Sequence, residues 1–164
     1  MTRTIAEKCN ALSIYWLNKN HCIPKHTGST SGVITWTFGN SDNKNSVGYT
    51  ITINEGESNI CLQYTHTNQL NNKEDMRYKI NLATTTCNFS GVRYWFTCPL
   101  SKDGKYCGRR VGVVYSIGKY FGCRHCGNIA YQAQMKSGKW RGCSITFPDI
   151  EKAEREIKRY YYKG

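Results

Sequence analysis

The chain has 164 residues, 39% of them hydrophobic, and it carries 23 Lys and Arg against 11 Asp and Glu, a formal net charge of +12. This length predicts one domain, or a small domain with an appended module. No run of 18 apolar residues occurs, and residues 1–20 lack the apolar core and small-residue cleavage site of a signal peptide. We therefore expect a cytoplasmic protein without a membrane partner.

The first predicted element is a short helix over residues 4–17. Thr4 and Glu7 form the T-x-x-E pattern of a capping box. Four apolar residues recur at helical spacing and would share one face: Ile5, Cys9, Leu12 and Trp16. We expect this face to pack against the protein's own sheet, with docking on a partner as the alternative.

Four β-prone runs follow, at residues 32–38, 46–53, 59–67 and 76–86. Their alternation of apolar and polar residues is typical of strands with one buried face. The short polar connections favour neighbouring antiparallel strands. The sequence therefore predicts a mainly β (α+β) fold, in which residues 1–90 form a helix and an antiparallel β-meander.

Two cysteine pairs mark the next part of the chain. Cys98 and Cys107 are separated by eight residues, Cys123 and Cys126 form a C-x-x-C, and 15 residues lie between the pairs. Glycines beside Cys107, Cys123 and Cys126 would permit left-handed turns that aim backbone amides at the sulfurs. Residues 109–121, rich in Val and Tyr and interrupted at 117–119, predict a β-hairpin between the pairs.

Two cysteine-bearing turns at one end of a hairpin suit tetrahedral Zn²⁺, and four protein ligands leave no position for water or substrate. We therefore predict a structural zinc ribbon over residues 91–135, with the ligands Cys98, Cys107, Cys123 and Cys126. The first pair is six residues longer than C-x₂-C, with residues 101–106 as the extra loop, so four buried or unpaired thiols remain the alternative. Disulfides are disfavoured in a reducing compartment.

The remaining cysteines are interpreted as small buried side chains, with Cys87 and Cys143 expected to be the more exposed: Cys9, Cys22, Cys61, Cys87 and Cys143. His21, Cys22 and His26 could form a loose second metal site if another pair of ligands joined them. His125, inside the C-x-x-C, could replace a cysteine as ligand, although a solvent-facing position is the simpler interpretation.

The C-terminal part, residues 136–164, is predicted as a basic loop and an amphipathic helix. Residues 129–134 could first pair as a closing strand of the ribbon. Pro148 and Asp149 are typical of a helix start, and the helix is expected over residues 148–163. Its end presents a candidate protein interface at Tyr160, Tyr161 and Tyr162.

Positive charge is concentrated in and just after the ribbon. Residues 91–141 contain ten Lys and Arg and one acid, Asp103. Such a surface suits a polyanion, so these bases are the candidate nucleic-acid contacts: Arg93, Lys102, Lys105, Arg109, Arg110, Lys119, Arg124, Lys136, Lys139 and Arg141. The alternative is a solvated basic face that aids solubility.

Motifs of the common enzyme classes are missing from the sequence. It contains no G-x-S-x-G, no phosphate-binding glycine-rich motif ending in Gly-Lys-Ser/Thr, and no H-x-E with P-C-x-x-C. We therefore expect a protein that is not an enzyme and has no small-molecule substrate.

The motifs RYWFTCP (93–99), CGRRV (107–111) and YFGCRHCGNIAY (120–131) resemble the signature of a widespread group of small, mostly uncharacterised bacterial zinc-ribbon proteins. The resemblance covers about residues 6–134 and implies zinc bound by the same four cysteines. The insertion at 101–106 and the C-terminal tail depart from that pattern.

Together these features predict a zinc-stabilised adaptor that binds DNA, RNA or a nucleoprotein complex through its basic ribbon. The alternative is a protein-interaction subunit that forms a homodimer or docks on a larger nucleic-acid enzyme. A phage, mobile-element or RNA-guided antiviral defence nuclease would be such an enzyme.

Overall fold

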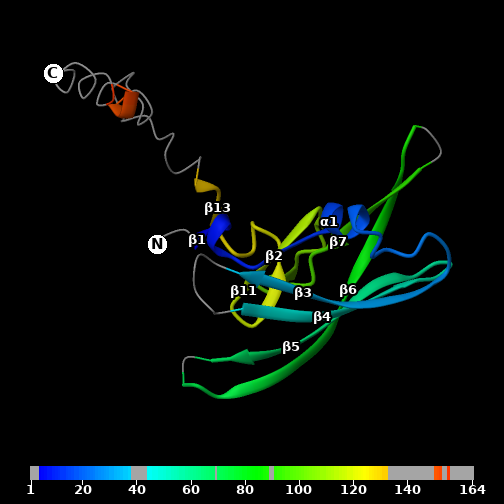
Figure 1. Ribbon diagram of the computed structural model, residues 1–164, viewed down its shortest axis with the longest axis horizontal. Coiled ribbons are helices and arrows are strands. Elements are labelled where there is room, and N and C mark those ends of the chain that lie inside the picture. Colours follow the sequence, from blue (N-terminus) through cyan, green and yellow to red (C-terminus); the bar gives the residue numbers. More distant parts are fainter. Residues whose placement is uncertain are drawn as a thin grey trace.

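A computed structural model describes residues 4–37, 44–68, 70–88, 91–132, 150–152 and 155. The fold of this part is mainly β, as predicted, and is built on a six-stranded antiparallel sheet in the order β10-β7-β6-β5-β4-β3 (Figure 1). The strands are β3 (Gly28–Thr37), β4 (Lys44–Ile53), β5 (Ser58–Thr67), β6 (Lys73–Thr86), β7 (Val92–Thr97) and β10 (Arg110–Val111). Strands β3 to β7 are neighbours in chain order, which confirms the predicted meander.

One face of this sheet is apolar and the other is polar, because successive side chains point to opposite faces. Ile51 opposes Ile60, and Ile60 opposes Ile80, so three fully buried isoleucines lie side by side on the core face. On the open face, the hydroxyls of Ser31 and Thr50 lie 2.9 Å apart across β3 and β4. Cross-strand pairs of this kind hold the register on both faces.

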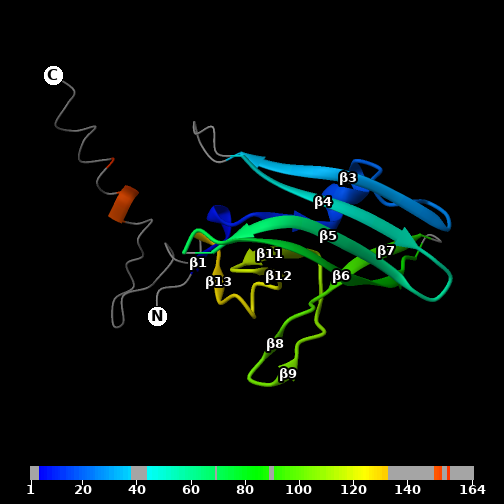
Figure 2. The same ribbon diagram turned by 90° about the horizontal axis from the view of Figure 1, so that it is seen from below.

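A smaller three-stranded sheet, in the order β12-β11-β2, covers the apolar face (Figure 2). It consists of β2 (Ala11–Ser13), β11 (Val113–Ile117) and β12 (Tyr120–Gly122). The hairpin expected between the cysteine pairs is thus present, and Gly118, with φ of 58°, lies in its two-residue turn. Val114 and Phe121 from this layer share one hydrophobic core with Phe96 of β7 and the isoleucines of the meander.

The prediction of a helix over residues 4–17 is wrong. The segment begins with β1 (Thr4–Ile5) and a 3₁₀ turn at Ala6–Lys8, continues as β2, and only Ile14–Lys19 forms an α-helix, α1. The residues expected on one buried helical face therefore have different environments: Leu12 is buried, whereas Trp16 is 47% exposed.

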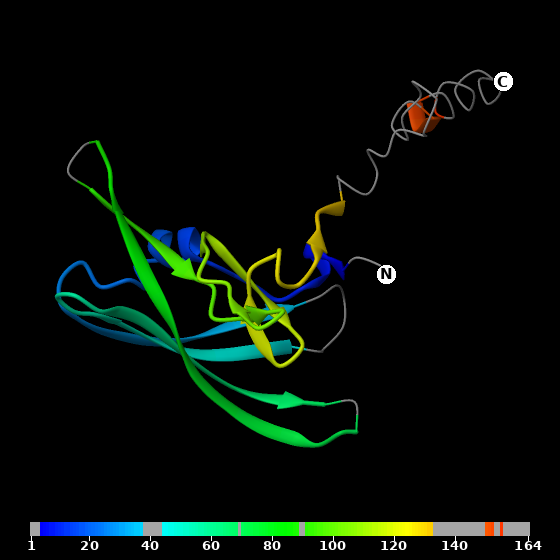
Figure 3. The same cartoon turned by 180° about the vertical axis from the view of Figure 1, so that it is seen from behind.

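Long-range strand pairing overrides the local helical pattern in this segment. β1 pairs in parallel with β13 (Ile129–Ala130), and β2 pairs with β11. Glu7, expected in a capping box, instead accepts a hydrogen bond of 3.1 Å from the backbone N–H of Gln132. The N-terminal residues therefore lie against the end of the ribbon (Figure 3).

The C-terminal part is described only at a few positions. Ile150, Glu151, Lys152 and Arg155 are helical, within the helix expected over residues 148–163. The rest of that helix and the basic loop at 136–141 lie outside the described residues. Within the described part of the chain, no helix is long and apolar enough to cross a membrane.

Candidate metal centre

The four predicted ligands lie together: the Sγ atoms of Cys98, Cys107, Cys123 and Cys126 are all within 4.8 Å of one another. Cys98 Sγ is 3.9 Å from Cys126 Sγ, and Cys107 Sγ is 3.8 Å from Cys123 Sγ. Because Zn–S bonds measure about 2.3 Å, a zinc tetrathiolate has sulfur–sulfur edges of about 3.8 Å. The donor set and its dimensions therefore fit a tetrahedral metal ion such as zinc.

The unusual spacing of the first pair is explained by one long hairpin. Beyond β7 the chain continues through β8 (Ser101–Lys102) and returns through β9 (Lys105–Tyr106) to β10. Backbone hydrogen bonds cross the hairpin on both sides of the cysteines, from Cys98 to Arg109 (2.9 Å) and from Cys107 to Leu100 (2.8 Å). The two thiols are thus brought to the same site by strand pairing rather than by a tight turn.

Residues 101–106 form a β-hairpin, which we name the finger, and not an irregular loop (Figure 2). Its two-residue turn has positive φ at both positions, 52° at Asp103 and 75° at Gly104. Asp-Gly is favoured in turns of this shape, which match the twist of the flanking strands. The insertion therefore has a defined structure that projects from the metal site.

In the second pair, backbone amides point at the sulfurs, as predicted. The N–H of Cys126 donates to Cys123 Sγ (3.5 Å), and the N–H of Cys123 donates to Cys98 Sγ (3.3 Å). Such bonds stabilise the thiolate form that a metal requires.

The glycines beside the cysteines have two different roles. Gly108 has a φ of 56° and is in the expected left-handed conformation. Gly122 and Gly127 have no positive φ, so the expectation was wrong for them. They are needed because a Cβ atom on Gly127 would lie 2.6 Å from Ile117 Cδ1, and one on Gly122 would meet the side chain of Leu100.

Burial of the site has a clear effect on its thiols. Cys98 and Cys123 are fully buried, whereas Cys107 and Cys126 are partly exposed. Desolvation raises the pKa of Cys98 and, together with the neighbouring thiols, that of Cys126. Desolvation also opposes ionisation of Cys107, but hydrogen bonds from the Arg109 amide and nearby thiols lower its pKa overall. A bound divalent cation would favour the thiolate at all four positions.

The alternative ligands are not part of this cluster. His125 is exposed, and desolvation together with Arg109 and Arg124 lowers its pKa. His21, Cys22 and His26 form no ligand group, since the four cysteines are the only such group among the described residues.

Three of the predicted nucleic-acid contacts lie around one recess beside the metal site. The recess has a volume of about 420 Å³ and is lined by Lys102, Lys105 and Arg109, together with Tyr106, His125 and the edges of Cys107 and Cys126. Both lysines come from the finger, and Arg110 follows on β10, exposed to solvent.

The other predicted contacts are spread over different surroundings. Arg93 lies over the ring of Trp95 (5.8 Å), and Arg124 lies over the ring of Tyr131 (5.4 Å). Lys136, Lys139 and Arg141 lie outside the described residues, as do the predicted interface residues Tyr160, Tyr161 and Tyr162.

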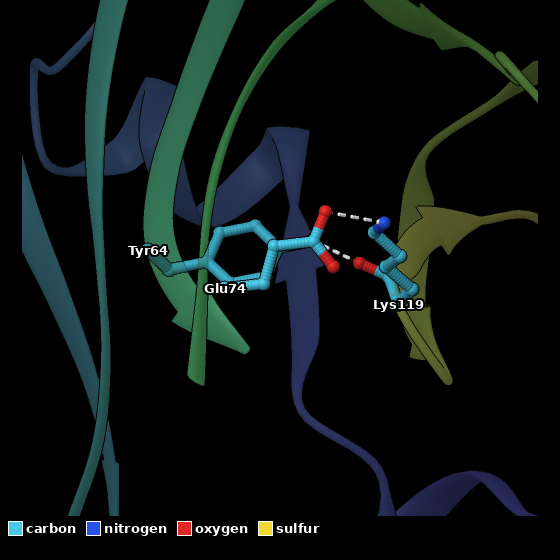
Figure 4. A network of polar contacts seen from close by, with 3 residues as sticks. All are labelled: Tyr64, Glu74 and Lys119. Atoms are coloured by element: carbon cyan, nitrogen blue, oxygen red, sulfur yellow. Dashed lines mark hydrogen bonds and ion pairs between the residues drawn. The ribbon is translucent and has the colours of Figure 1, made fainter. Parts of the chain in front are cut away.

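Lys119 is engaged within the protein. Its Nζ lies 2.6 Å from Glu74 Oε1 on β6, and its backbone carbonyl accepts a hydrogen bond from the Tyr64 hydroxyl (Figure 4). Sequence reasoning missed Tyr64 and Glu74, which are 55 and 45 residues from Lys119 and carry no local signal.

Comparison with protein-family models, curated proteins and solved structures gave no match. The fold and the site together define a mainly β protein with a four-cysteine cluster that could hold a metal ion.

Proposed function

We propose that this protein is a zinc-stabilised adaptor that binds DNA, RNA or a nucleoprotein complex through its basic ribbon and is not an enzyme. The all-sulfur donor set supports zinc in a structural role, because four thiolates complete the tetrahedral coordination. The proposal includes a relationship to the bacterial zinc-ribbon proteins that the cysteine motifs resemble.

The main support for the proposal is the net positive charge that the ribbon keeps once the negative charge of a zinc tetrathiolate is subtracted. Zn²⁺ with four thiolates has a double negative charge, so some of the surrounding bases would neutralise it. Residues 91–132 hold seven Lys and Arg and one acid, Asp103; because Lys119 is paired with Glu74, an excess of three positive charges remains. A surplus of exposed bases beside a rigid turn favours phosphate contacts, especially through arginine.

The test compares two triple variants that lose the same charge. In the first, Lys102, Lys105 and Arg109 are changed to Ala; in the control, the exposed bases Lys73, Arg77 and Lys79 of β6 are changed to Ala. Affinity for DNA and RNA is measured between about 50 and about 200 mM salt.

We expect the ribbon variant to weaken binding and to reduce the slope of log affinity against log salt by roughly 2–3, as for three lost phosphate contacts. The control should retain the slope of the unmodified protein. Equal losses in both variants would contradict the proposal, as would an absence of binding to any nucleic acid. Zinc content is measured for each variant, because the same bases could act by neutralising the metal site.

The second candidate is a protein-interaction subunit that docks on a larger nucleic-acid enzyme, such as a phage, mobile-element or defence nuclease, or that forms a homodimer. Two aromatic residues of α1 favour it: Tyr15 is 52% exposed and Trp16 is 47% exposed. Tyr and Trp are enriched among residues that dominate protein interfaces. Binding anchored by them would respond little to salt and would be lost in Trp16→Ala.

A further inference from the structure

The recess beside the metal site has the size and the chemistry of a ligand site. At about 420 Å³ it falls in the range of small-molecule pockets. Three cationic side chains, Lys102, Lys105 and Arg109, and no carboxylate are among the residues that line it. An anionic group would be favoured in this recess even though the metal cluster itself is negative.

Tyr106 gives the recess an aromatic wall. Its ring lines the recess and is 61% exposed. A Cβ atom at Gly108 would lie only 3.1 Å from Tyr106 Cε1, so the ring occupies space that exists because residue 108 has no side chain. The exposed ring offers a face on which a planar group can stack.

A basic residue set and an aromatic side chain around one recess match the two parts of a nucleotide. Phosphate oxygens pair with Lys and Arg, while the base stacks on an aromatic face or on imidazole. His125, from the segment of the second cysteine pair, also lines the recess and supplies such an imidazole. In a duplex the bases are stacked inside the helix and cannot enter a recess of this kind.

We infer that the finger recess binds one unpaired nucleotide of a single-stranded nucleic acid, with its phosphate on Lys102, Lys105 and Arg109 and its base on Tyr106. This inference rests on the proposed function and names the class of nucleic acid. In this inference, the finger at residues 101–106 makes the protein prefer single-stranded over duplex nucleic acid.

The role of Tyr106 separates this inference from simple charge compensation. Neutralisation of the zinc site requires the bases but not the aromatic ring, because the tyrosine side chain is not a cation. A stacked base, by contrast, depends on the ring and not on the hydroxyl. Tyr106→Phe keeps the ring, whereas Tyr106→Leu keeps only an apolar side chain.

The experiment titrates the zinc-loaded full chain with a labelled single-stranded oligonucleotide and with the duplex of the same sequence. We expect tighter binding of the single strand, and about tenfold weaker single-strand binding in Tyr106→Leu, as for one lost base stack. Duplex affinity and zinc content should stay unchanged in that variant. Tyr106→Phe should bind like the unmodified protein, and so should Tyr15→Leu, which removes another exposed aromatic, from α1 (52% exposed against 61% for Tyr106).

A measurement on the unmodified chain gives an independent readout. Ultraviolet crosslinking to an iodouracil-containing single strand, followed by peptide mass spectrometry, should place the adduct on the finger at Tyr106. Equal affinity for single strand and duplex, equal binding by Tyr106→Leu and Tyr106→Phe, or crosslinks that avoid the finger would each overturn the inference while the proposed function stands. Absence of binding to every nucleic acid would overturn both.

Discussion

The Tyr64 hydroxyl donates a hydrogen bond of 2.6 Å to the backbone carbonyl of Lys119, 55 residues further along the chain. The same hydroxyl lies 3.2 Å from that of Tyr78, which accepts a 2.8 Å bond from the N–H of Phe121. Two tyrosines of the meander thus hold the turn and second strand of the ribbon hairpin. The basic ribbon is therefore fixed to the large sheet by partly buried polar contacts as well as by the shared core.

We predict that Tyr78→Phe destabilises the protein by about 1–3 kcal/mol, because the N–H of Phe121 would lose its partner in a partly buried position. Tyr64→Phe should cost about 1 kcal/mol, the usual net value of one hydrogen bond. Glu74→Gln serves as the control, since its exposed ion pair with Lys119 should contribute little. Urea unfolding measures all three, and an effect of Glu74→Gln as large as that of Tyr78→Phe would contradict this ranking.

Removal of the metal should unfold at least residues 92–134. Binding free energy at a structural zinc site is largely folding free energy, and the ribbon shares its core with the meander through Phe96, Val114 and Phe121. A chelator should therefore change the near-ultraviolet circular dichroism and the tryptophan fluorescence together.

Elemental analysis should find one zinc per chain, and the Co²⁺-substituted protein should show an all-thiolate spectrum. Cys123→Ser should lose the metal, whereas Cys61→Ser, at a partly buried cysteine outside the cluster, should retain it. An unchanged circular dichroism spectrum after complete metal removal would show that the ribbon folds without a metal ion, which contradicts the prediction.

The close contact between Gly122 and Leu100 predicts a non-additive pair of substitutions. A Cβ atom on Gly122 would lie 2.8 Å from Leu100 Cγ and still closer to its Cδ1. Gly122→Ala should cost about 1–3 kcal/mol through overpacking next to Cys123, and should weaken metal binding. Leu100→Ala in the same chain should recover part of that loss. If the destabilisations caused by Gly122→Ala and Leu100→Ala simply add in the double variant, the contact with Leu100 is not the reason that residue 122 is glycine.

Alkaline pH should destabilise the protein through its buried tyrosines. Burial, followed by the contact with Cys22, raises the pKa of Tyr49 from 10.0 to about 12, and burial also raises the pKa values of Tyr64, Tyr78 and Tyr115. A raised pKa means that the native state holds the proton more tightly than the unfolded state.

The stabilising contribution of these tyrosines is therefore complete below pH 10 and is lost as the pH rises through the native values. We expect the free energy of unfolding to fall between about pH 10 and about pH 12. Urea unfolding at pH 8 and pH 11, together with tyrosinate absorbance, measures this. Tyrosines that all titrate near pH 10 in the folded protein would contradict it.

Local patterns in the sequence predict a large part of this structure. Alternation with a period of two predicted the four strands of the meander, because one face of each strand must be apolar to cover the core. The cysteine spacing with its interposed hairpin predicted the four-thiol cluster. The turn at Gly118 was also visible, since glycine tolerates positive φ without a steric cost.

Only the tertiary structure decided the remainder. Residues 4–5 and 11–13 lie in a segment with a helical pattern but form strands, because β13 and β11 offer them pairing partners at least 100 residues away. Tyr64, Glu74 and Lys119 meet only after the meander and the ribbon pack together. Periodicity and spacing are properties of neighbouring residues, whereas these contacts depend on which distant surfaces bury each other, and a single sequence carries no local signal for that choice.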